Sequence, residues 1–472
     1  MTAYFSFNIL WKREERSGNV PLRFFILLSF MDEKKLRRDA LEIFQSGLEA
    51  VNPQKAIIRN LIFEVGKLKV GEKTYDLEDY KQIFIFGAGK ASAAMAQPLE
   101  EILMERIKGG LINVKYGHVL PLKKIEINEA GHPLPDEAGF RGAKKMVEML
   151  KKTGERDLVF FLISGGGSAL LPYPQEGVSL DDKKKVTQIL LEAGATIAEI
   201  NIVRKHISKL KGGRLAKIVF PSSLISLILS DVVDDKLDTI ASGPTVPDES
   251  TFKDCLEIAQ RYGVWEKFPV GVRRLIEKGL SGLVDETPKE DDPAFKKVQN
   301  VIIARNRDAV ESARRKAEEL GYNAMIISTS VEGEAKEVAK VHVAIAKEIL
   351  SSGNPLKRPA CVISGGETTV TIRGKGLGGR NQEFALEAAI GIEGYPGVLI
   401  LSCGTDGTDG PTDAAGAMVD GMSVRRAKEL GLEARKYLRE NDSYHFFKRL
   451  GDLIFTGPTF TNVMDLRLVL VG

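Results

Sequence analysis

Glycine and charged side chains first come together in the segment GAGKAS, which contains Gly87, Gly89 and Lys90 and follows an apolar run ending at Phe86. Glycine lets a backbone approach a ligand closely, and the N–H groups of a helix start attract anions. Lys90 falls in the expected first helical turn, where a cation opposes the helix dipole unless an anion is bound. This pattern predicts that Lys90 contacts an anion; the alternative is a solvated lysine.

A second glycine segment, SGGGS, follows the apolar run 158–163. Its residues are Ser164, Gly165, Gly166, Gly167 and Ser168. Successive backbone N–H groups in such a turn can form a concave anion site, although packing alone could also require a tight turn. A serine nucleophile is disfavoured because no histidine has a sequence signature that ties it to this segment, and the G-x-S-x-G elbow is absent.

The third segment runs from Cys361 to Phe384 and reads CVISGGETTVTIRGKGLGGRNQEF. An apolar run opens into Ser364, and Arg380 directly precedes a predicted helix start at Asn381. A guanidinium beside a helix start would add a fork of charged donors to an anion site. The alternative is a glycine-rich surface hairpin with solvated charges.

Basic residues gather at the end of another predicted helix. They are Arg204, Lys205, Lys209, Lys211 and Arg214. Cations at a helix C-terminus complement its dipole, so a solvated helix end explains them equally well. The functional alternative is that one or two of them hold a substrate carboxylate.

Aspartates follow two further apolar runs: Asp231 comes after 224–229, and Asp406 comes after 398–402. The spacing around Asp406 does not match a calcium-binding EF-hand loop. Carboxylates at strand ends near a phosphate site suit Mg²⁺ binding and the orientation of an attacking hydroxyl. Turn-forming Asp-Gly pairs are the alternative.

The elements that must position these residues alternate between apolar runs and amphipathic helices. Expected strands are 81–86, 111–114, 158–163, 224–229, 301–304, 322–327, 360–363 and 398–402. This alternation predicts parallel βαβ units in an α/β fold, with ligands at the carboxyl ends of the strands. Helical spacing also predicts a helix through Leu61 and Val65, one long helix from Val186 to Ile197, and another from Ile202.

A charged, proline-containing segment at 285–299 predicts a domain boundary. We therefore expect an N-terminal α/β domain at 31–290 and a C-terminal α/β domain at 298–472. Residues 1–30 differ from the rest and are expected to be either a mis-called start or a dispensable extension, because the segment from Met31 reads like a natural start. The apolar run 24–30 is too short to span a bilayer.

Composition excludes several classes of protein. The chain is 43% hydrophobic and 28% charged, which is typical of a globular protein. A net charge of +3 gives no argument for a nucleic-acid surface. Three widely spaced cysteines favour a reducing, cytoplasmic location over a disulfide framework or a CxxC metal site. Because glycine loops, cations and aspartates accompany no cysteine or histidine cluster, the residues favour phosphoryl transfer without covalent enzyme chemistry.

The chain resembles the class II glycerate kinases, the glycerate 2-kinase family whose C-terminal part is called the MOFRL domain. The matching segments are GAGKAS (87–92), GHPLPDEAG (131–139), SGGGSALL (164–171), RKHISKLKGGRLA (204–216), LSDVVDD (229–235), ASGPTVPD (241–248), SGGETTV (364–370), GLGGRNQE (376–383), GTDGTDGPTDAAGA (404–417) and TGPTFTNVMDL (456–466). They cover nearly all of residues 31–472. Phe460 stands where a small residue is expected.

The resemblance implies transfer of the γ-phosphoryl group of ATP, with Mg²⁺, to the 2-hydroxyl of D-glycerate. It also implies a larger Rossmann-like domain and a smaller MOFRL domain with the site in a cleft between them. It is compatible with a homodimer, and we expect no nucleic-acid or membrane partner. By this resemblance Lys90 and Arg380 would stabilise charge on the transferring group, and Asp231 or Asp406 would carry Mg²⁺ or orient the hydroxyl.

Phosphate or carboxylate groups would be held by residues of the glycine segments and the basic cluster. The expected binding residues are Gly87, Gly89, Ser164, Gly165, Gly166, Gly167, Ser168, Lys205, Lys211, Ser364, Gly365, Gly366, Glu367 and Asn381.

Three other functions remain open on the residues. A nicotinamide-dependent hydroxypyruvate reductase is disfavoured because Ser92 replaces the third glycine of the dinucleotide motif and no ribose-binding acid follows 111–114. A non-catalytic nucleotide-binding module is disfavoured by the charged groups at several strand ends. A glycerate 3-kinase differs only in the hydroxyl that is phosphorylated.

Overall fold

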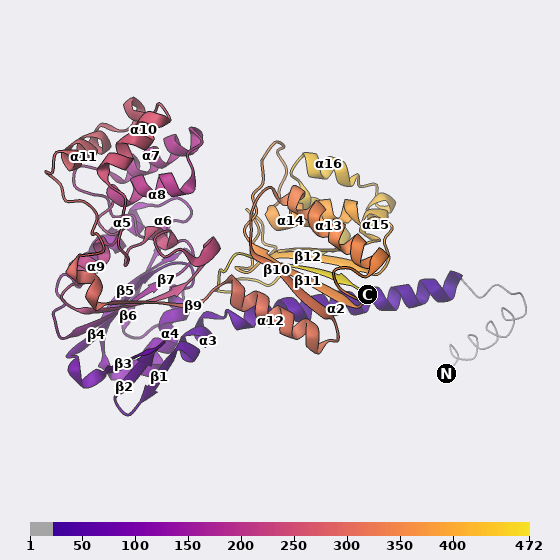
Figure 1. Cartoon of the computed structure of the whole chain (residues 1–472), viewed down its shortest axis with the longest axis horizontal. Coiled ribbons are helices and arrows are strands. Elements are labelled where there is room, and N and C mark those ends of the chain that lie inside the picture. The colour runs from indigo at the N-terminus through magenta and orange to yellow at the C-terminus, as the bar shows by residue number, and fades with distance from the viewer. Residues whose placement is uncertain (1–21) are drawn as a thin grey trace, which may run out of the picture. The chain divides into compact units, whose positions relative to one another are not determined.

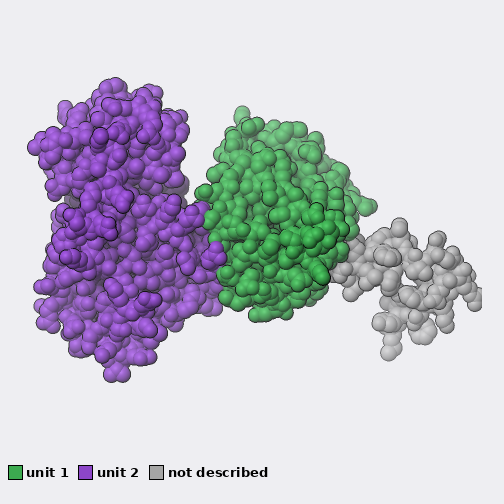
Figure 2. All heavy atoms as spheres, viewed as in Figure 1, with its two compact units in different colours: residues 1–46, 310–457, 465–472 green, residues 47–309, 458–464 purple. Residues whose placement is uncertain are grey.

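A computed structural model describes residues 22–472, which form two compact units (Figure 2). The large unit comprises residues 47–309 and 458–464; the small unit comprises residues 310–457 and 465–472 with the chain up to residue 46. Of the predicted extension at 1–30, residues 1–21 lie outside the described residues, and helix α2 (Leu22–Ala50) includes the remainder. Among the described helices, none combines the length and the apolar character needed to cross a membrane.

The large unit is built on a six-stranded sheet in which every pairing is parallel. Its strands are β4 (Gln82–Ala88), β5 (Ile107–Lys115), β6 (Ile125–Ala130), β7 (Asp157–Ile163), β8 (Ser223–Leu229) and β9 (Val298–Ala304). The strand order is β6-β5-β4-β7-β8-β9, so the chain adds strands on one side of β4 first and then, from β7 on, on its other side. Ligands in such sheets bind at this switch point, and the two glycine segments of this unit lie at the carboxyl ends of these two strands.

Helices pack on both faces of this sheet or form a separate cluster. Their bounds are α3 (Pro53–Asn60), α4 (Ser92–Leu103), α5 (Glu137–Leu150), α6 (Gly167–Leu170), α7 (Leu180–Glu192), α8 (Ile197–His206), α9 (Arg214–Val219), α10 (Phe252–Arg261) and α11 (Val270–Leu280). Helices α7, α8, α10 and α11 gather at one end of the unit around their own apolar core (Figure 1).

Two helix predictions for this unit were wrong. The long helix expected at 186–197 is broken, because Thr196 and Glu199 form a capping box that begins α8 at Ile197. The helix expected through Leu61 and Val65 is a small antiparallel sheet. Its strands are β1 (Leu61–Glu64), β2 (Lys67–Val70) and β3 (Lys73–Asp76). In β2 the buried positions alternate with exposed ones, a two-residue period that the sequence reading missed.

Strand β9 pairs with β8 in register Leu224↔Val298. The parallel sheet of the large unit therefore includes residues 298–304, which the sequence analysis assigned to the C-terminal domain. The compact units divide between Ala309 and Val310, inside α12 (Asn306–Glu319).

The small unit is α/β, as predicted, and contains a mixed six-stranded sheet. Its strands are β10 (Asn323–Val331), β11 (Ala360–Gly366), β12 (Val398–Gly404), β13 (Gly416–Asp420), β14 (Leu453–Ile454) and β15 (Asp465–Val471). In the order β10-β11-β15-β12-β13-β14 only β10 and β11 are parallel. The C-terminal strand β15 thus runs antiparallel between β11 and β12, so the start of β15 lies beside the ends of both.

Helices cover both faces of this mixed sheet. Helices α13 (Ala335–Ser352), α14 (Arg380–Gly391), α15 (Ser423–Glu429), α16 (Ala434–Arg439) and α17 (Ser443–Leu450) follow its strands. Figure 1 shows α13 and α14 on one face and α2 with α12 on the other. The core beneath α13 and α14 combines small and branched side chains, including Ala339, Ala385 and Val469, with buried aromatic rings such as Phe384.

Candidate functional site

The two glycine segments of the large unit contact each other. A Cβ atom on Gly89, whose φ is +147°, would lie 2.1 Å from the Ser164 Oγ atom. The Ala91 N–H donates to that oxygen at 3.0 Å, and the Lys90 N–H donates to the Gly165 carbonyl at 2.9 Å. Gly87 packs equally closely, because its Cβ would lie 2.6 Å from a backbone oxygen of β7. The predicted residues that follow β4 and β7 therefore form one continuous backbone surface.

Asp231, from the end of β8, lies against this surface. A Cβ on Gly165 would lie 2.6 Å from Asp231 Oδ2 and 2.6 Å from Asn462 Nδ2. The Asn462 amide donates to Asp231 Oδ2 at 3.3 Å. The structure thus brings a predicted carboxylate to the glycine segment and adds an amide from the chain that returns at 458–464.

The sequence reading missed two residues here, Asn462 and His132. A Cβ on Gly166 would lie 2.7 Å from the His132 imidazole, so this ring also borders the glycine segment. Both residues fall in segments that match the family, 131–139 and 456–466, which is the signal that could have found them. No local spacing identifies either one.

Lys211 supports the second glycine segment from inside the protein. Its Nζ atom donates to the Ser168 carbonyl at 2.9 Å, to Ser168 Oγ at 2.9 Å and to the Ala241 carbonyl at 3.2 Å. The side chain is only 1% exposed. Burial, with the nearby cations Arg204 and Lys183, lowers the pKa of Lys211 well below its ordinary value.

Lys205 faces carboxylates instead of the glycine segments. Its Nζ atom lies 3.2 Å from Asp248 and 3.5 Å from Asp238. These three residues, with Asn201 among others, line a cavity of about 610 Å³ in the large unit. The predicted basic cluster therefore divides, with Lys211 beside the loop and Lys205 in an ion-pair network.

In the small unit, Arg380 is held by two carboxylates. Its Nε atom donates to Asp465 Oδ2 at 2.8 Å and its Nη2 atom to Asp465 Oδ1 at 2.9 Å. Its Nη1 atom lies 2.8 Å from Glu367 Oε1. Burial alone lowers the pKa of Arg380, but Asp465 and Glu367 raise it, and the net pKa lies above the ordinary value. Arg380 is 30% exposed, so part of this charged group reaches the surface.

The start of α14, predicted to bind an anion, binds a carboxylate of the protein itself. Asp409 accepts hydrogen bonds from the backbone N–H of Asn381 at 3.0 Å and of Gln382 at 2.8 Å. The Asn381 side chain donates to Asp465 at 2.9 Å and accepts from Ser402 at 2.6 Å. Burial raises the pKa of Asp409 to about 6 despite these donors. Asn381 is thus an interior linker between carboxylates.

The glycine segment after β11 packs tightly inside the small unit. Ser364 is fully buried, and its Oγ atom lies 2.8 Å from His342 Nε2. A Cβ on Gly366, whose φ is +116°, would lie 2.3 Å from the Val331 backbone nitrogen. Gly365 is buried as well. Ser364 and Gly366 therefore have interior contacts that account for their residue types, whereas the neighbouring Glu367 is exposed.

The two aspartates assigned to a metal belong to different units, Asp231 to the large one and Asp406 to the small one. Both are partly exposed, and Asp406 also accepts hydrogen bonds from the Thr408 backbone and hydroxyl at 3.1 and 3.2 Å. Within residues 22–472 no group of three His, Cys, Asp or Glu side chains forms a dedicated metal cage. Mg²⁺ in kinases takes one or two carboxylates plus substrate phosphates and water, so the carboxylate of either aspartate, taken within its own unit, is a donor of the type that this ion uses.

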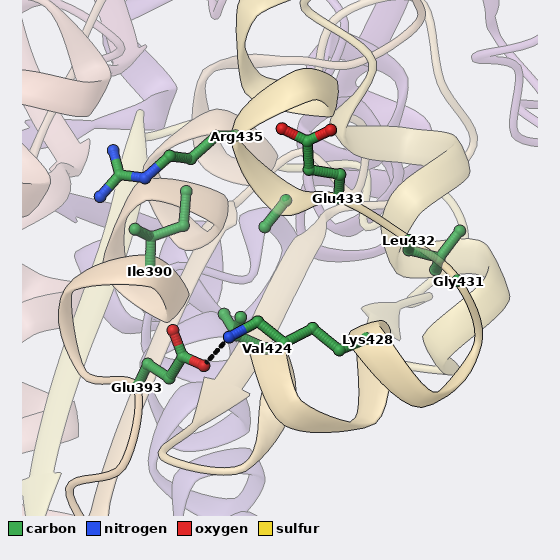
Figure 3. Close-up of a pocket in the computed structure, with 9 residues that line it drawn as sticks. Ile390, Glu393, Val424, Lys428, Gly431, Leu432, Glu433 and Arg435 are labelled. Carbon is green, nitrogen blue, oxygen red and sulfur yellow. Dashed lines mark hydrogen bonds and ion pairs between the residues drawn. The ribbon is translucent and has the colours of Figure 1, made fainter.

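A surface hollow of about 430 Å³ lies among α14, α15 and α16 (Figure 3). Lys428 and Glu393, which both line it, form an ion pair. Its lining contains none of the residues that the sequence analysis selected. We therefore assign it no part in the reaction.

Comparison with known proteins identifies the family of the chain. The DUF4147 model, a domain of unknown function, matches residues 39–277, and the MOFRL family model matches residues 360–465. A glycerate 2-kinase from Pyrococcus horikoshii is 45% identical over 437 residues, which cover 92% of this chain and 97% of the relative. A D-glycerate 2-kinase from Thermotoga maritima is 43% identical over 93% of this chain and 99% of the relative.

A crystal structure of a glycerate kinase from Thermotoga maritima superposes with a TM-score of 0.82 at 42% identity, covering 93% of this chain and 100% of that one. A protein from Agrobacterium vitis that is named a putative hydroxypyruvate reductase is 40% identical, covering 91% of this chain and 93% of the relative.

Proposed function

The chain is a glycerate 2-kinase of the DUF4147 and MOFRL family, and we propose that it transfers the γ-phosphoryl group of ATP to the 2-hydroxyl of D-glycerate. The observation that carries this proposal is the similarity to two glycerate 2-kinases along almost their whole length. The geometry supports it, because the glycine segments after β4 and β7 meet at the switch point of a parallel sheet, where phosphate groups bind.

We assign the large unit to phosphate binding and charge stabilisation. The backbone of Gly87, Gly89 and residues 164–168 would contact phosphate or carboxylate oxygens, and Lys90 would stabilise charge on the transferring group. Phosphoryl transfer needs such positioning and charge neutralisation more than a strong nucleophile. Lys211 has a supporting role in this assignment, since its ammonium group braces Ser168.

In the small unit we assign Arg380 to the same transferring group. The two hydrogen bonds from Arg380 to Asp465 support this role, because they orient the guanidinium in advance. An oriented group loses little entropy when it binds the transition state. Glu367 and Asp465 keep the group charged and limit its movement.

Asp231 and Asp406 are our candidates to hold Mg²⁺. A bound Mg²⁺ would neutralise charge on the nucleotide phosphates. Of the two, Asp231 has the stronger structural support, because it touches Gly165 and receives a hydrogen bond from Asn462. We also place the enzyme in the cytoplasm, since Cys255, Cys361 and Cys403 are all free and buried.

The test is an ADP-release assay with D-glycerate, L-glycerate and related hydroxy acids. We expect release with D-glycerate, and phosphorus NMR of the product should show the phosphate on the 2-hydroxyl. A 3-phosphate would identify a glycerate 3-kinase. No ADP release, together with loss of NADH absorbance on adding hydroxypyruvate, would replace the kinase with the reductase named for the Agrobacterium vitis relative.

A further inference from the structure

Three cations that the assigned site does not use as ligands come together in the large unit. Lys183 lies on α7, Arg204 on α8, and Lys211 in the turn after α8. Helices α7 and α8 lie side by side (Figure 1), and both contribute to one apolar core, through Val186 and Val203 respectively. Lys183 is 7% exposed and Lys211 is 1% exposed, whereas Arg204 is partly exposed. The cluster is therefore buried and opens toward solvent at Arg204.

Among the described residues, 22–472, no carboxylate forms an ion pair with any of these three side chains. In the described part of the chain the Lys183 Nζ atom is buried and has no hydrogen-bond partner. Arg204 Nη1 reaches Asn201 Oδ1 at 3.5 Å, which is long for a hydrogen bond. Lys211 donates only to a hydroxyl and two backbone carbonyls. Buried charges are normally paired, so the composition of the cluster suits the binding of an anion.

Burial and the neighbouring cations lower the pKa of both lysines. Burial, followed by the charge of Arg204, lowers the pKa of Lys183 to about 7. Burial, followed by the charges of Arg204 and Lys183, lowers the pKa of Lys211 as well. An anion placed among the three groups would oppose both shifts.

Hydrogen bonds connect this cluster to the glycine segment after β7. Ser168 Oγ lies 3.0 Å from Ser242 Oγ, which donates to Asn201 Oδ1 at 3.3 Å. Asn201 in turn contacts Arg204. Ser242 has a φ of +62°, a backbone conformation that residues other than glycine rarely adopt. The strained segment therefore joins the cations to the loop assigned to phosphate binding.

We propose that Lys183 and Arg204, with Lys211 behind them, form a phosphate-binding subsite that takes a phosphate group of the nucleotide. That this phosphate group belongs to a nucleotide rests on the proposed function, whereas the existence of a phosphate-binding subsite does not. A phosphate group suits the cluster better than a carboxylate, because a carboxylate carries one charge and would leave most of the positive charge unpaired. Arg204, at the open side, would contact the anion first, and Lys183 would close on its inner oxygen.

The experiment is calorimetric binding of inorganic pyrophosphate, ADP and D-glycerate to the full-length chain and to Lys183→Met and Arg204→Met. We expect each substitution to weaken pyrophosphate and ADP binding by about 10- to 100-fold, the usual loss for one charge-assisted hydrogen bond, and to leave D-glycerate binding unchanged. Lys185→Met is the matched control, because Lys185 is an exposed lysine on the same helix as Lys183. This variant should bind all three compounds with wild-type affinity.

Thermal unfolding separates binding from a structural role. Without added anion, Lys183→Met should be at least as stable as wild type, since it removes an unpartnered buried charge. Pyrophosphate should raise the Tm of wild type more than that of Lys183→Met. A loss of stability in Lys183→Met without anion would show a structural lysine and overturn the proposal.

Two binding outcomes would also overturn it: unchanged pyrophosphate and ADP affinities in both variants, or weakened binding of D-glycerate alone. Failure of the kinase assignment would look different. In that case wild type would release no ADP with D-glycerate, while pyrophosphate would still bind and would still depend on Lys183.

Discussion

Both carboxylate oxygens of Asp465 accept hydrogen bonds from Arg380, at 2.8 Å from Nε and 2.9 Å from Nη2. The same carboxylate accepts a hydrogen bond from the fully buried Arg467 at 2.8 Å and from Asn381 at 2.9 Å. One buried anion therefore fixes the direction of the guanidinium that we assign to the transferring phosphoryl group. Loss of the Asp465 carboxylate should therefore lower both the stability of the protein and its kcat.

We expect Asp465→Asn to lower the unfolding free energy by about 3–5 kcal/mol, because two arginines lose a buried partner. It should also reduce kcat by about 10²–10³-fold through the loss of Arg380 orientation. Chemical denaturation and steady-state kinetics measure the two effects. Glu429→Gln, at an exposed carboxylate elsewhere in the small unit, is the control and should change neither quantity. Near-normal kcat in a folded Asp465→Asn would refute the positioning role.

A substitution of Lys90 tests the catalytic role that we assign to this residue of the large unit. Lys90→Ala should lower kcat by about 10²–10³-fold, since it removes a cation that stabilises the charge developing in the transition state. Because the side chain is only half-buried, the Tm should stay close to that of wild type. Lys81→Ala, at an exposed lysine just before β4, is the matched control. If both variants turn over alike, Lys90 has no catalytic role.

The close approach of Gly89 to Ser164 predicts that this glycine cannot be replaced. Gly89→Ala would place a Cβ 2.6 Å from the Ser164 carbonyl oxygen and should cost about 2–4 kcal/mol of stability, with most activity lost. Gly66→Ala is the control, because Gly66 also has a positive φ but has nothing within 4 Å of the added Cβ. It should cost about 1–2 kcal/mol from backbone strain and leave kcat unchanged. Equal effects in the two variants would contradict the packing argument.

The buried His342 side chain should make the unfolding free energy depend on pH. Burial lowers its pKa to about 4, below the ordinary 6.5, so the unfolded chain takes up a proton there before the folded chain does. The stability that this neutral histidine contributes is therefore present above pH 6.5 and is lost as the pH falls toward 4. The loss should approach about 3 kcal/mol.

Denaturation of wild type and His342→Gln between pH 7 and 4 measures this contribution. Glutamine keeps an acceptor for the Ser364 hydroxyl but does not titrate, so the wild type should lose more stability than the variant over this range. Parallel curves would mean that His342 is protonated in the folded state at an ordinary pKa. Asp409 is unchanged in both proteins, so its own titration cancels in the comparison.

Much of the large unit could be read from the chain alone. The strands β4, β7 and β8 are short apolar runs with glycine or aspartate within two residues of the end of each, and both features are local in sequence. Because carboxyl ends of parallel strands meet at one edge, these patterns were enough to bring Gly89, Ser164 and Asp231 to one place. The family resemblance then added the reaction.

Local patterns failed where partners are distant in sequence. Arg380 and Asp465 are 85 residues apart, and the antiparallel insertion of β15 between β11 and β12 brings them together. The same holds for Asn462, which joins a unit formed mainly by residues 47–309. The residue types of the chain thus determined which chemistry was available and which segments form strands. Only the tertiary structure decided which buried charges are paired, because that depends on strand order and long-range packing that no short window of sequence contains.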